Sequence, residues 1–276
     1  MRPALIIAMT TLLLPLPGRA MQPLFDSHLH YSEADARVYS PAQIIAILDR
    51  YQIQRAVVTG TPAQHALDLY QHAPERILPF LGVYRSSADK GGWTQDTGLP
   101  DRVQQALAQG RWRGVGELHI FAQQRHSPVF LRIVDLSSAQ GLPLLMHCDP
   151  AVIDSLFEHR PDATVIWAHA GAYPYPALLA DYLQRYPRLY VDLSVRDERI
   201  APGGVLDGEW EILLMEHAGR FLIGVDTYRT ERWEEYGAAT ALIRGWLTQL
   251  PASVALQLAR DNAARLFMID DDAHNR

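Results

Sequence analysis

The chain has a single cysteine, no excess of positive charge and, beyond its first residues, no long apolar run. One cysteine excludes an internal disulfide framework. A formal net charge of −6 without a basic cluster argues against stable binding of nucleic acid through phosphate neutralisation. No apolar run in the body of the chain reaches the roughly 20 residues of a bilayer-spanning helix. With 48% hydrophobic and 20% charged residues, the composition is that of a globular protein of one large α/β domain or two small ones.

The first twenty residues differ from the rest of the sequence. A basic start at Arg2, an apolar stretch too short to cross a membrane, and small residues at Gly18 and Ala20 are typical of a secretory signal peptide. Cleavage after Ala20 leaves a mature domain of residues 21–276, which we expect to be periplasmic or secreted. If translation instead starts at Met21, the protein is cytoplasmic.

Short apolar runs alternate with amphipathic stretches along the rest of the chain. Strands are expected at residues 23–28, 54–59, 77–83, 113–117, 143–147, 164–168, 189–193 and 221–225. Helical patterns lie near residues 41–51, 62–73, 99–109, 127–140, 150–159, 174–185, 207–218 and 231–248. Several strands are continuously apolar, which is expected where both faces of a parallel sheet are buried. Asp149-Pro150 predicts the start of a helix, with an N-cap acid before a proline.

Eight strand–helix units in roughly 250 residues match a (β/α)8 TIM barrel. A doubly wound open sheet is the main alternative. Nucleotide-binding sheets of that kind carry a glycine-rich turn after the first strand, and this chain has none there. Because no repeat, low-complexity segment or linker indicates a second domain, we predict a single barrel.

Residues with metal-binding side chains stand at the ends of the predicted strands. His28 and His30 are two positions apart in an extended run, so both imidazoles leave the same face of the strand. The other candidates each close a later apolar run: Glu117, His147, His169 and Asp226. Residues so far apart converge on one point only if the sheet closes into a barrel. The pattern therefore predicts a metal site at the C-terminal ends of the barrel strands.

These motifs, in this order, resemble the amidohydrolase superfamily, in particular its amidohydrolase-2 branch of metal-dependent hydrolases. The resemblance spans residues 23–267. The segments that carry it are Phe25-Asp26-Ser27-His28-Leu29-His30, Gly116-Glu117-Leu118-His119, Pro143-Leu144-Leu145-Met146-His147-Cys148, Trp167-Ala168-His169-Ala170-Gly171, Leu222-Ile223-Gly224-Val225-Asp226-Thr227 and Asp261-Asn262-Ala263-Ala264-Arg265-Leu266-Phe267. Such a likeness is specific for the superfamily and says little about the substrate.

The resemblance implies a role for each candidate ligand. His28 and His30 would bind the first metal ion. Asp226 would touch the same ion and act as the general base for the attacking water, and His147 would be the ligand from the fifth strand. His169 would bind a second ion or polarise the carbonyl oxygen of the substrate.

Glu117 decides between one metal ion and two. It stands where many members of the superfamily carry a carboxylated lysine that bridges two ions, so the resemblance is compatible with a two-metal site. In members with one ion, Glu117 would only orient its neighbours. Two structural alternatives stay open: Glu117 could pair with an arginine of the barrel, and Asp226 could cap the helix that follows it.

Imidazole and carboxylate ligands suit zinc, manganese or nickel. We expect one or two divalent ions, with zinc first among them. A bound cation lowers the pKa of water from roughly 15.7 to about 7, and Asp226 can accept the proton. This predicts metal-assisted hydrolysis of an ester, lactone, amide or phosphoester bond. The alternatives are a metal-dependent decarboxylase of the same superfamily and a secreted metal-binding protein without catalytic activity.

Polar side chains near the same strand ends are candidates for substrate binding: Arg85, His119, Arg196 and Tyr228. The arginines suggest a small anionic substrate such as a carboxylate or a phosphate ester, and their alternative role is solvated loop charge. Trp93 is a candidate lid over the mouth of the site. Barrel enzymes often pair through their outer helices. Both a homo-oligomer and a monomer therefore stay open.

Overall fold

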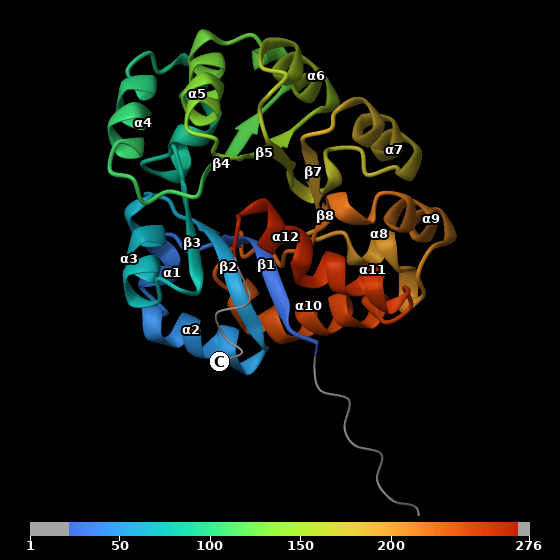
Figure 1. The fold of residues 1–276 in the computed structure, drawn as a ribbon. Helices are drawn as coiled ribbons and strands as arrows, with labels where there is room; N and C mark the ends of the chain where they lie inside the picture. The colour runs from blue at the N-terminus through green and yellow to red at the C-terminus, as the bar shows by residue number, and fades with distance from the viewer. Residues whose placement is uncertain (1–21, 270–276) are drawn as a thin grey trace, which may run out of the picture.

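A computed structural model describes residues 22–269 and shows eight parallel strands paired in the order β1 to β8 (Figure 1). The strands are β1 Leu24–His30, β2 Ile53–Thr59, β3 Ile77–Leu81, β4 Gly114–Ile120, β5 Leu144–Cys148, β6 Val165–Trp167, β7 Leu189–Asp192 and β8 Phe221–Leu222. The predicted signal peptide and its cleavage site lie outside the described residues, so export stays a prediction.

Helices follow the strands and surround them (Figure 1). They are α1 Glu33–Ala36, α2 Pro41–Arg50, α3 Gln64–His72, α4 Leu99–Leu107, α5 Pro128–Ala139, α6 Pro150–His159, α7 Pro176–Arg185, α8 Asp197–Ile200, α9 Gly208–Glu216, α10 Arg232–Leu247, α11 Ala252–Leu256 and α12 Asn262–Leu266. Within residues 22–269, no helix combines the length and the apolar character needed to cross a membrane.

Backbone hydrogen bonds between β1 and the segment after β8 close the circle of strands. The N–H of Ser27 donates to the carbonyl oxygen of Ile223 at 2.8 Å, and the N–H of Asp226 donates to that of His28 at 2.8 Å. With the pairing from β1 to β8, these bonds complete a barrel and confirm the predicted TIM-barrel fold.

Several strands end at other residues than predicted where they reach the site, and β1 continues to His30 and not only to residue 28. β4 continues to Ile120 and not only to residue 117, so Glu117 lies inside the strand. β8 ends at Leu222, although the sequence predicts a strand to residue 225, and the following residues Ile223 and Asp226 hydrogen-bond to β1. The close approach of the segment after β8 to β1 requires glycine, because a Cβ on Gly224 would lie 2.8 Å from the Cβ of His28.

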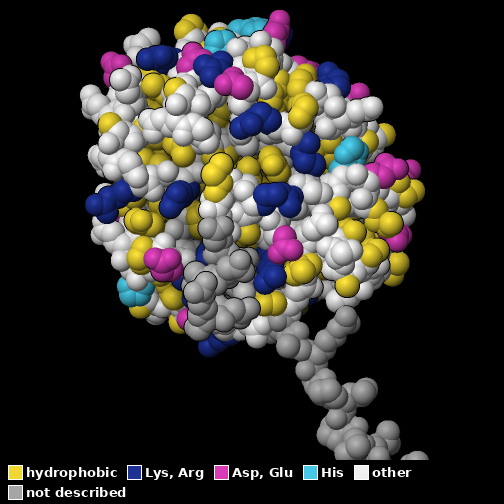
Figure 2. All heavy atoms as spheres, in the orientation of Figure 1, with side chains coloured by type: hydrophobic (Ala, Val, Ile, Leu, Met, Phe, Trp, Pro, Cys, Tyr) yellow, Lys and Arg dark blue, Asp and Glu magenta, His cyan; other side chains and the backbone are white. Residues whose placement is uncertain are grey.

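Apolar side chains fill the barrel interior away from the candidate metal ligands. Phe25 stacks on Phe267, with ring centroids 5.9 Å apart, and Phe80 meets the same ring edge-on at 5.9 Å. Phe267 follows α12, so the closing helix completes this inner cluster. A larger apolar layer packs between the strands and the surrounding helices. On the face seen in Figure 2, acidic and basic side chains are interspersed among apolar ones.

The predicted start of α6 is confirmed in position but not in its side-chain contact. Asp149 is the N-cap residue and Pro150 the first residue of the helix. The carboxylate of Asp149, however, accepts a hydrogen bond from the N–H of Ala122 at 2.9 Å and makes no cap bond to its own helix. The side chain therefore joins α6 to the loop after β4.

Asp26 is a buried carboxyl group that ties β1 to the segment after β8 and to α10. Its Oδ1 accepts hydrogen bonds from the N–H groups of His28 and Val225, and its Oδ2 accepts one from the hydroxyl of Tyr236 at 2.6 Å. Burial raises the pKa of Asp26 to about 7, although these three hydrogen bonds oppose the rise. The carboxyl therefore binds a proton more tightly in the folded chain than in the unfolded one.

This pKa predicts how stability depends on pH. Between the ordinary pKa of 3.8 and the raised pKa of about 7, the folded state binds more protons, so the free energy of unfolding falls as pH rises through that window. Asp26→Asn supplies a neutral side chain that can still meet Tyr236. Between about pH 5 and about pH 8, we expect the free energy of unfolding of the wild type to fall by about 2 to 3 kcal/mol relative to that of this variant. Urea unfolding of metal-free protein measures the difference, and an unchanged difference at the two pH values would contradict the expectation.

Candidate metal centre

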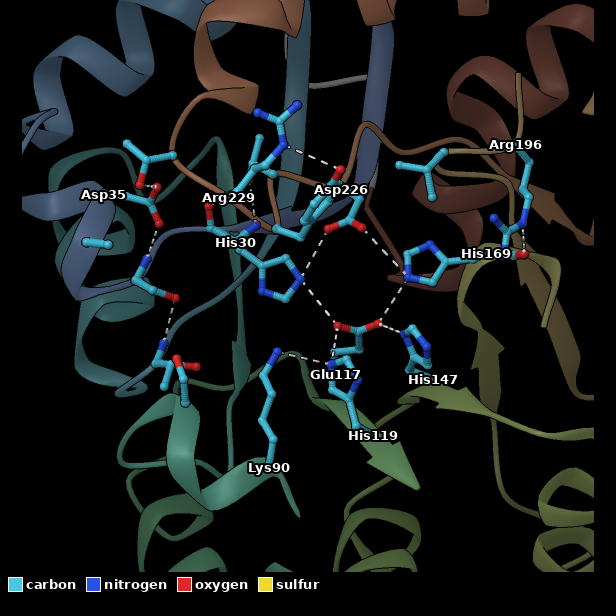
Figure 3. A pocket seen from close by; sticks show the side chains of 18 residues that line it. His30, Asp35, Lys90, Glu117, His119, His147, His169, Arg196, Asp226 and Arg229 are labelled. Atoms are coloured by element: carbon cyan, nitrogen blue, oxygen red, sulfur yellow. Dashed lines mark hydrogen bonds and ion pairs between the residues drawn. The ribbon is translucent and has the colours of Figure 1, made fainter. Parts of the chain in front are cut away.

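The six residues predicted as metal ligands meet at the C-terminal ends of the strands, and Figure 3 labels all of them except His28. They come from five places in the barrel: His28 and His30 from β1, Glu117 from β4, His147 from β5, His169 from the 3₁₀ turn η4 (Ala168–Ala170) and Asp226 from the segment after β8. Most of these side chains are buried. His147 is the exception, with 46% of its side chain exposed, and it stands at the rim.

The first ligand group gathers around one oxygen of Glu117. Oε2 of Glu117 lies 3.3 Å from Nε2 of His30 and 3.8 Å from Nε2 of His28, and these two nitrogens are 3.3 Å apart. Oδ1 of Asp226 lies 3.3 Å from Nε2 of His30 and 3.8 Å from Nε2 of His28. Two atoms bound to one ion at about 2.1 Å lie about 3.0 to 3.4 Å apart. The four side chains therefore surround a space close to the size of one ion.

The second ligand group gathers around the other oxygen of Glu117. Oε1 lies 3.0 Å from Nδ1 of His147 and 3.2 Å from Nε2 of His169. Oδ2 of Asp226 lies 3.7 Å from the same nitrogen of His169. Glu117 and Asp226 thus each present one oxygen to each group.

A buried oxygen without a hydrogen-bond partner tests whether these residues fit a cation. Among residues 22–269, Oδ1 of Asp226 is one of three buried side-chain polar atoms with no hydrogen-bond partner. Buried carboxylate oxygens are almost always paired. This one faces His28 and His30 at separations that suit a shared ion. The donor set therefore fits a divalent metal.

The imidazoles of His28 and His169 are oriented by one buried acid that the sequence did not single out, Asp192 at the end of β7. Nδ1–H of His28 donates to Oδ2 of Asp192 at 2.8 Å. Nδ1–H of His169 donates to the hydroxyl of Ser194 at 2.9 Å, and that hydroxyl donates to the same oxygen of Asp192 at 2.5 Å. Both rings are thereby held with Nε2 facing the ligand groups, as in other metal sites where a carboxylate supports a histidine ligand.

The charges of the imidazoles keep the three acids ionised. Burial raises the pKa of Glu117, but the charge of His28 and hydrogen bonds to His119, His147 and His169 hold it well below its usual range. Burial also raises the pKa values of Asp226 and Asp192, and in both cases His28 contributes most to the net lowering. Anionic carboxylates in a buried site are the form that binds a cation.

Two of the candidate ligands hold a backbone conformation that is rare outside glycine. His169 has φ of 58° and Asp226 has φ of 56°. Such left-handed residues cost about 1 to 3 kcal/mol each and occur where the surrounding structure fixes a functional side chain. Here they turn the chain at the ends of β6 and β8, so that both side chains face Glu117.

The model of the amidohydrolase family Amidohydro_2 matches residues 17–269. The chain belongs to this family. As a member of it, the protein is a metal-dependent hydrolase of the amidohydrolase type, which confirms the resemblance found in the motifs. A search of curated proteins gave no significant match.

Solved structures similar to this amidohydrolase share its barrel at low sequence identity. An uncharacterised TIM-barrel protein from Bordetella bronchiseptica is 15% identical with a TM-score of 0.64, and the match covers 90% of this chain and 99% of that one. A probable 2-pyrone-4,6-dicarboxylic acid hydrolase from Acinetobacter baumannii, with citric acid bound, is 15% identical with a TM-score of 0.61 over 90% and 100% of the two chains. An amidohydrolase from Burkholderia multivorans with bound zinc is 14% identical with a TM-score of 0.58 over the same shares.

A cavity of about 480 Å³ opens over the ligand groups of the amidohydrolase. Three of the four residues predicted to bind substrate line it, namely His119, Arg196 and Tyr228. Arg196 is held in place by its own chain neighbours, since its Nε–H donates to the carbonyl oxygen of His169 at 2.7 Å. Nε2 of His119 lies 3.0 Å from Oε2 of Glu117. Burial lowers the pKa of His119.

Arg85 and Trp93 do not lie where the sequence prediction put them. Arg85 does not line the cavity: 70% of its side chain is exposed, and its Nε–H donates to Asp89 at 3.2 Å. The loop after β3 turns back on itself through this pair, which points the arginine away from the site. Trp93 is no lid, because it is buried and donates its indole N–H to the carbonyl oxygen of His119 at 2.7 Å.

The two alternative roles for Asp226 and Glu117, as a helix cap and as the partner of an arginine, are wrong. The N-cap of α10 is Glu231, so Asp226 does not cap the helix that follows it. Within residues 22–269, the ionic contacts of Glu117 are all with histidines and none is with an arginine.

The residues that sequence reasoning missed are Asp192, Ser194 and Lys90. Asp192 did carry a signal, since it is an acid that ends the apolar run of β7. Its role was hidden because it acts behind two histidines and does not face the cavity. Lys90 lies in a short 3₁₀ segment, η1 (Ser87–Gly91), that no strand or helix pattern marks.

The support from Asp192 leads to a prediction for metal affinity. Asp192→Asn removes the charge opposite His28 and turns an acceptor into a donor, so His28 loses its orientation. We expect the affinity for zinc to fall about 10- to 100-fold. Competition with a fluorescent chelator measures it. Asp197→Asn is the matched control, because this acid at the same end of the barrel bonds to Trp246 and to no ligand. Equal zinc affinities for the two variants would contradict the role of Asp192.

Proposed function

We propose that this amidohydrolase hydrolyses an ester, lactone, amide or phosphoester bond of a small anionic substrate with two divalent ions, zinc in the first instance. The observation that supports two ions is Glu117, whose two oxygens each face a separate ligand group. His28 and His30 would hold one ion and His147 and His169 the other. Glu117 and Asp226 would supply carboxylate oxygens to them.

When bound, the ions would supply activated water and polarise the bond to be broken. The protein's own groups have distinct tasks. Asp226 would accept the proton of the attacking water and return it to the leaving group, which requires the anionic form of its carboxylate. The buried position of Asp226 keeps bulk water away from this carboxylate. Asp192 and Ser194 keep the imidazoles of His28 and His169 from rotating.

An anionic substrate is supported by the charges of the cavity. Lys90, Arg196 and Arg229 line it, and Arg229 is paired with Glu235 at 2.7 Å. Lys90 and Arg196 have no ion pair with a carboxylate in the described part of the chain. A similar structure is that of a probable hydrolase of 2-pyrone-4,6-dicarboxylic acid, which is a lactone with two acid groups, and it contains citric acid.

Substitution of the proposed base tests this function. Asp226→Asn keeps the size of the side chain but cannot accept the proton of water, so we expect turnover to fall about 10²- to 10⁴-fold. Turnover is measured on zinc-loaded protein with 2-pyrone-4,6-dicarboxylate, phenyl acetate and p-nitrophenyl phosphate. Asp181→Asn, at an exposed acid on α7, is the control.

The results of these assays distinguish hydrolysis through Asp226 from the two alternative functions. Full activity of Asp226→Asn, with circular dichroism showing a folded protein, would contradict the role of Asp226. Release of carbon dioxide from a carboxylated substrate without hydrolysis would indicate a decarboxylase. No turnover of any substrate by zinc-loaded wild type, together with tight zinc binding, would indicate a metal-binding protein without catalytic activity.

A further inference from the structure

Lys90 is the only lysine of the chain. The sequence has 25 lysines and arginines, and the other 24 are all arginine. Lysine and arginine are not interchangeable, since lysine carries a compact charge with three rotatable N–H donors whereas arginine presents a larger planar group. The one position at which this chain uses lysine lies in the wall of the cavity above the metal-binding residues.

The side chain of Lys90 reaches from η1 towards Glu117 (Figure 3). Its Nζ lies 3.3 Å from Nε2 of His119 and 5.9 Å from the centre of the Tyr84 ring. No carboxylate forms an ion pair with it within residues 22–269. A partly buried ammonium group beside an imidazole and an aromatic ring therefore faces the cavity without a neutralising partner.

Few of the hydrogen-bond donors of Lys90 are used by the protein. The ammonium group has three N–H donors, and Nε2 of His119 can accept at most one of them. The same nitrogen lies 3.0 Å from Oε2 of Glu117 and cannot donate to Glu117 while it accepts from Lys90. At least two donors of Lys90 are thus available in the cavity. Arg196 is anchored instead, because its Nε–H and one other of its five N–H donors are used by the carbonyl oxygens of His169 and Gly171.

We propose that Lys90 binds an anionic oxygen group of the substrate, a carboxylate or a phosphate, and is thereby a specificity-determining residue of this site. The inference rests on the proposed function for the existence of a substrate and adds the residue that selects it. Charge-assisted hydrogen bonds of this kind are roughly twice as strong as neutral ones, so an uncharged substrate of the same shape binds more weakly. His119 acts as a positioning residue, because it holds the ammonium group on one side.

A sole lysine permits a direct measurement without chemical modification. Lysine labelled with ¹³C at the ε carbon gives one side-chain signal in the NMR spectrum, and its absence from Lys90→Arg assigns it. Zinc-loaded protein is titrated with tricarballylate, a tricarboxylate without the hydroxyl group of citrate, and separately with inorganic phosphate. We expect a saturable shift of the signal with at least one of them, and the comparison shows which oxygen group is preferred.

Variants separate binding at Lys90 from binding elsewhere in the cavity. Lys90→Met should weaken the binding of the effective anion about tenfold or more, as measured by calorimetry. Lys90→Arg keeps the charge but not the geometry and should restore part of the affinity. Arg199→Met is the control, because Arg199 lies in α8, which Arg196 precedes, but does not line the cavity. Thermal melting shows whether each variant is folded.

Two results would overturn the proposal: a Lys90 signal that neither anion shifts, or an anion affinity that is the same in Lys90→Met and in the wild type. Both are independent of turnover. Metal content and hydrolysis are measured separately, so a failure of the proposed function is recognised by the absence of bound zinc or of activity and not by the Lys90 signal.

Discussion

The site depends on one buried carboxylate, that of Glu117, with imidazole nitrogens on both of its oxygens. His30 and His28 face one oxygen, and His147 and His169 face the other. A buried anion is costly unless it is compensated, and here the compensation comes from ligand-type side chains that are themselves suited to cations. The barrel makes this possible, because strands far apart in the sequence end at one point.

Behind this carboxylate, two further buried acids hold the ligands in place. Asp192 orients His28 directly and His169 through Ser194. Asp26 joins β1 to the segment after β8, two residues before the first histidine ligand. One acid therefore sets the directions of the rings, and the other helps to close the barrel on which their spacing depends.

The sequence predicted the parts of the site that follow from strand geometry. His28 and His30 lie on one face because they are two apart in a strand, and the other ligands stand at strand ends that a barrel brings together. Side chains set by loop conformation were not predictable in the same way. Arg85 turns away to Asp89, and Lys90 enters the cavity from a short 3₁₀ segment without a periodic pattern. Asp192 was missed because its partners are side chains distant in the sequence.

The measurement that tests this account most directly is the zinc content per chain, by elemental analysis, of wild type and Glu117→Gln after equilibration with zinc and removal of the excess. If Glu117 bridges two ions, the wild type holds about two equivalents and the variant one or fewer. A wild type with one equivalent, or a variant that still binds two, would contradict the central role of Glu117.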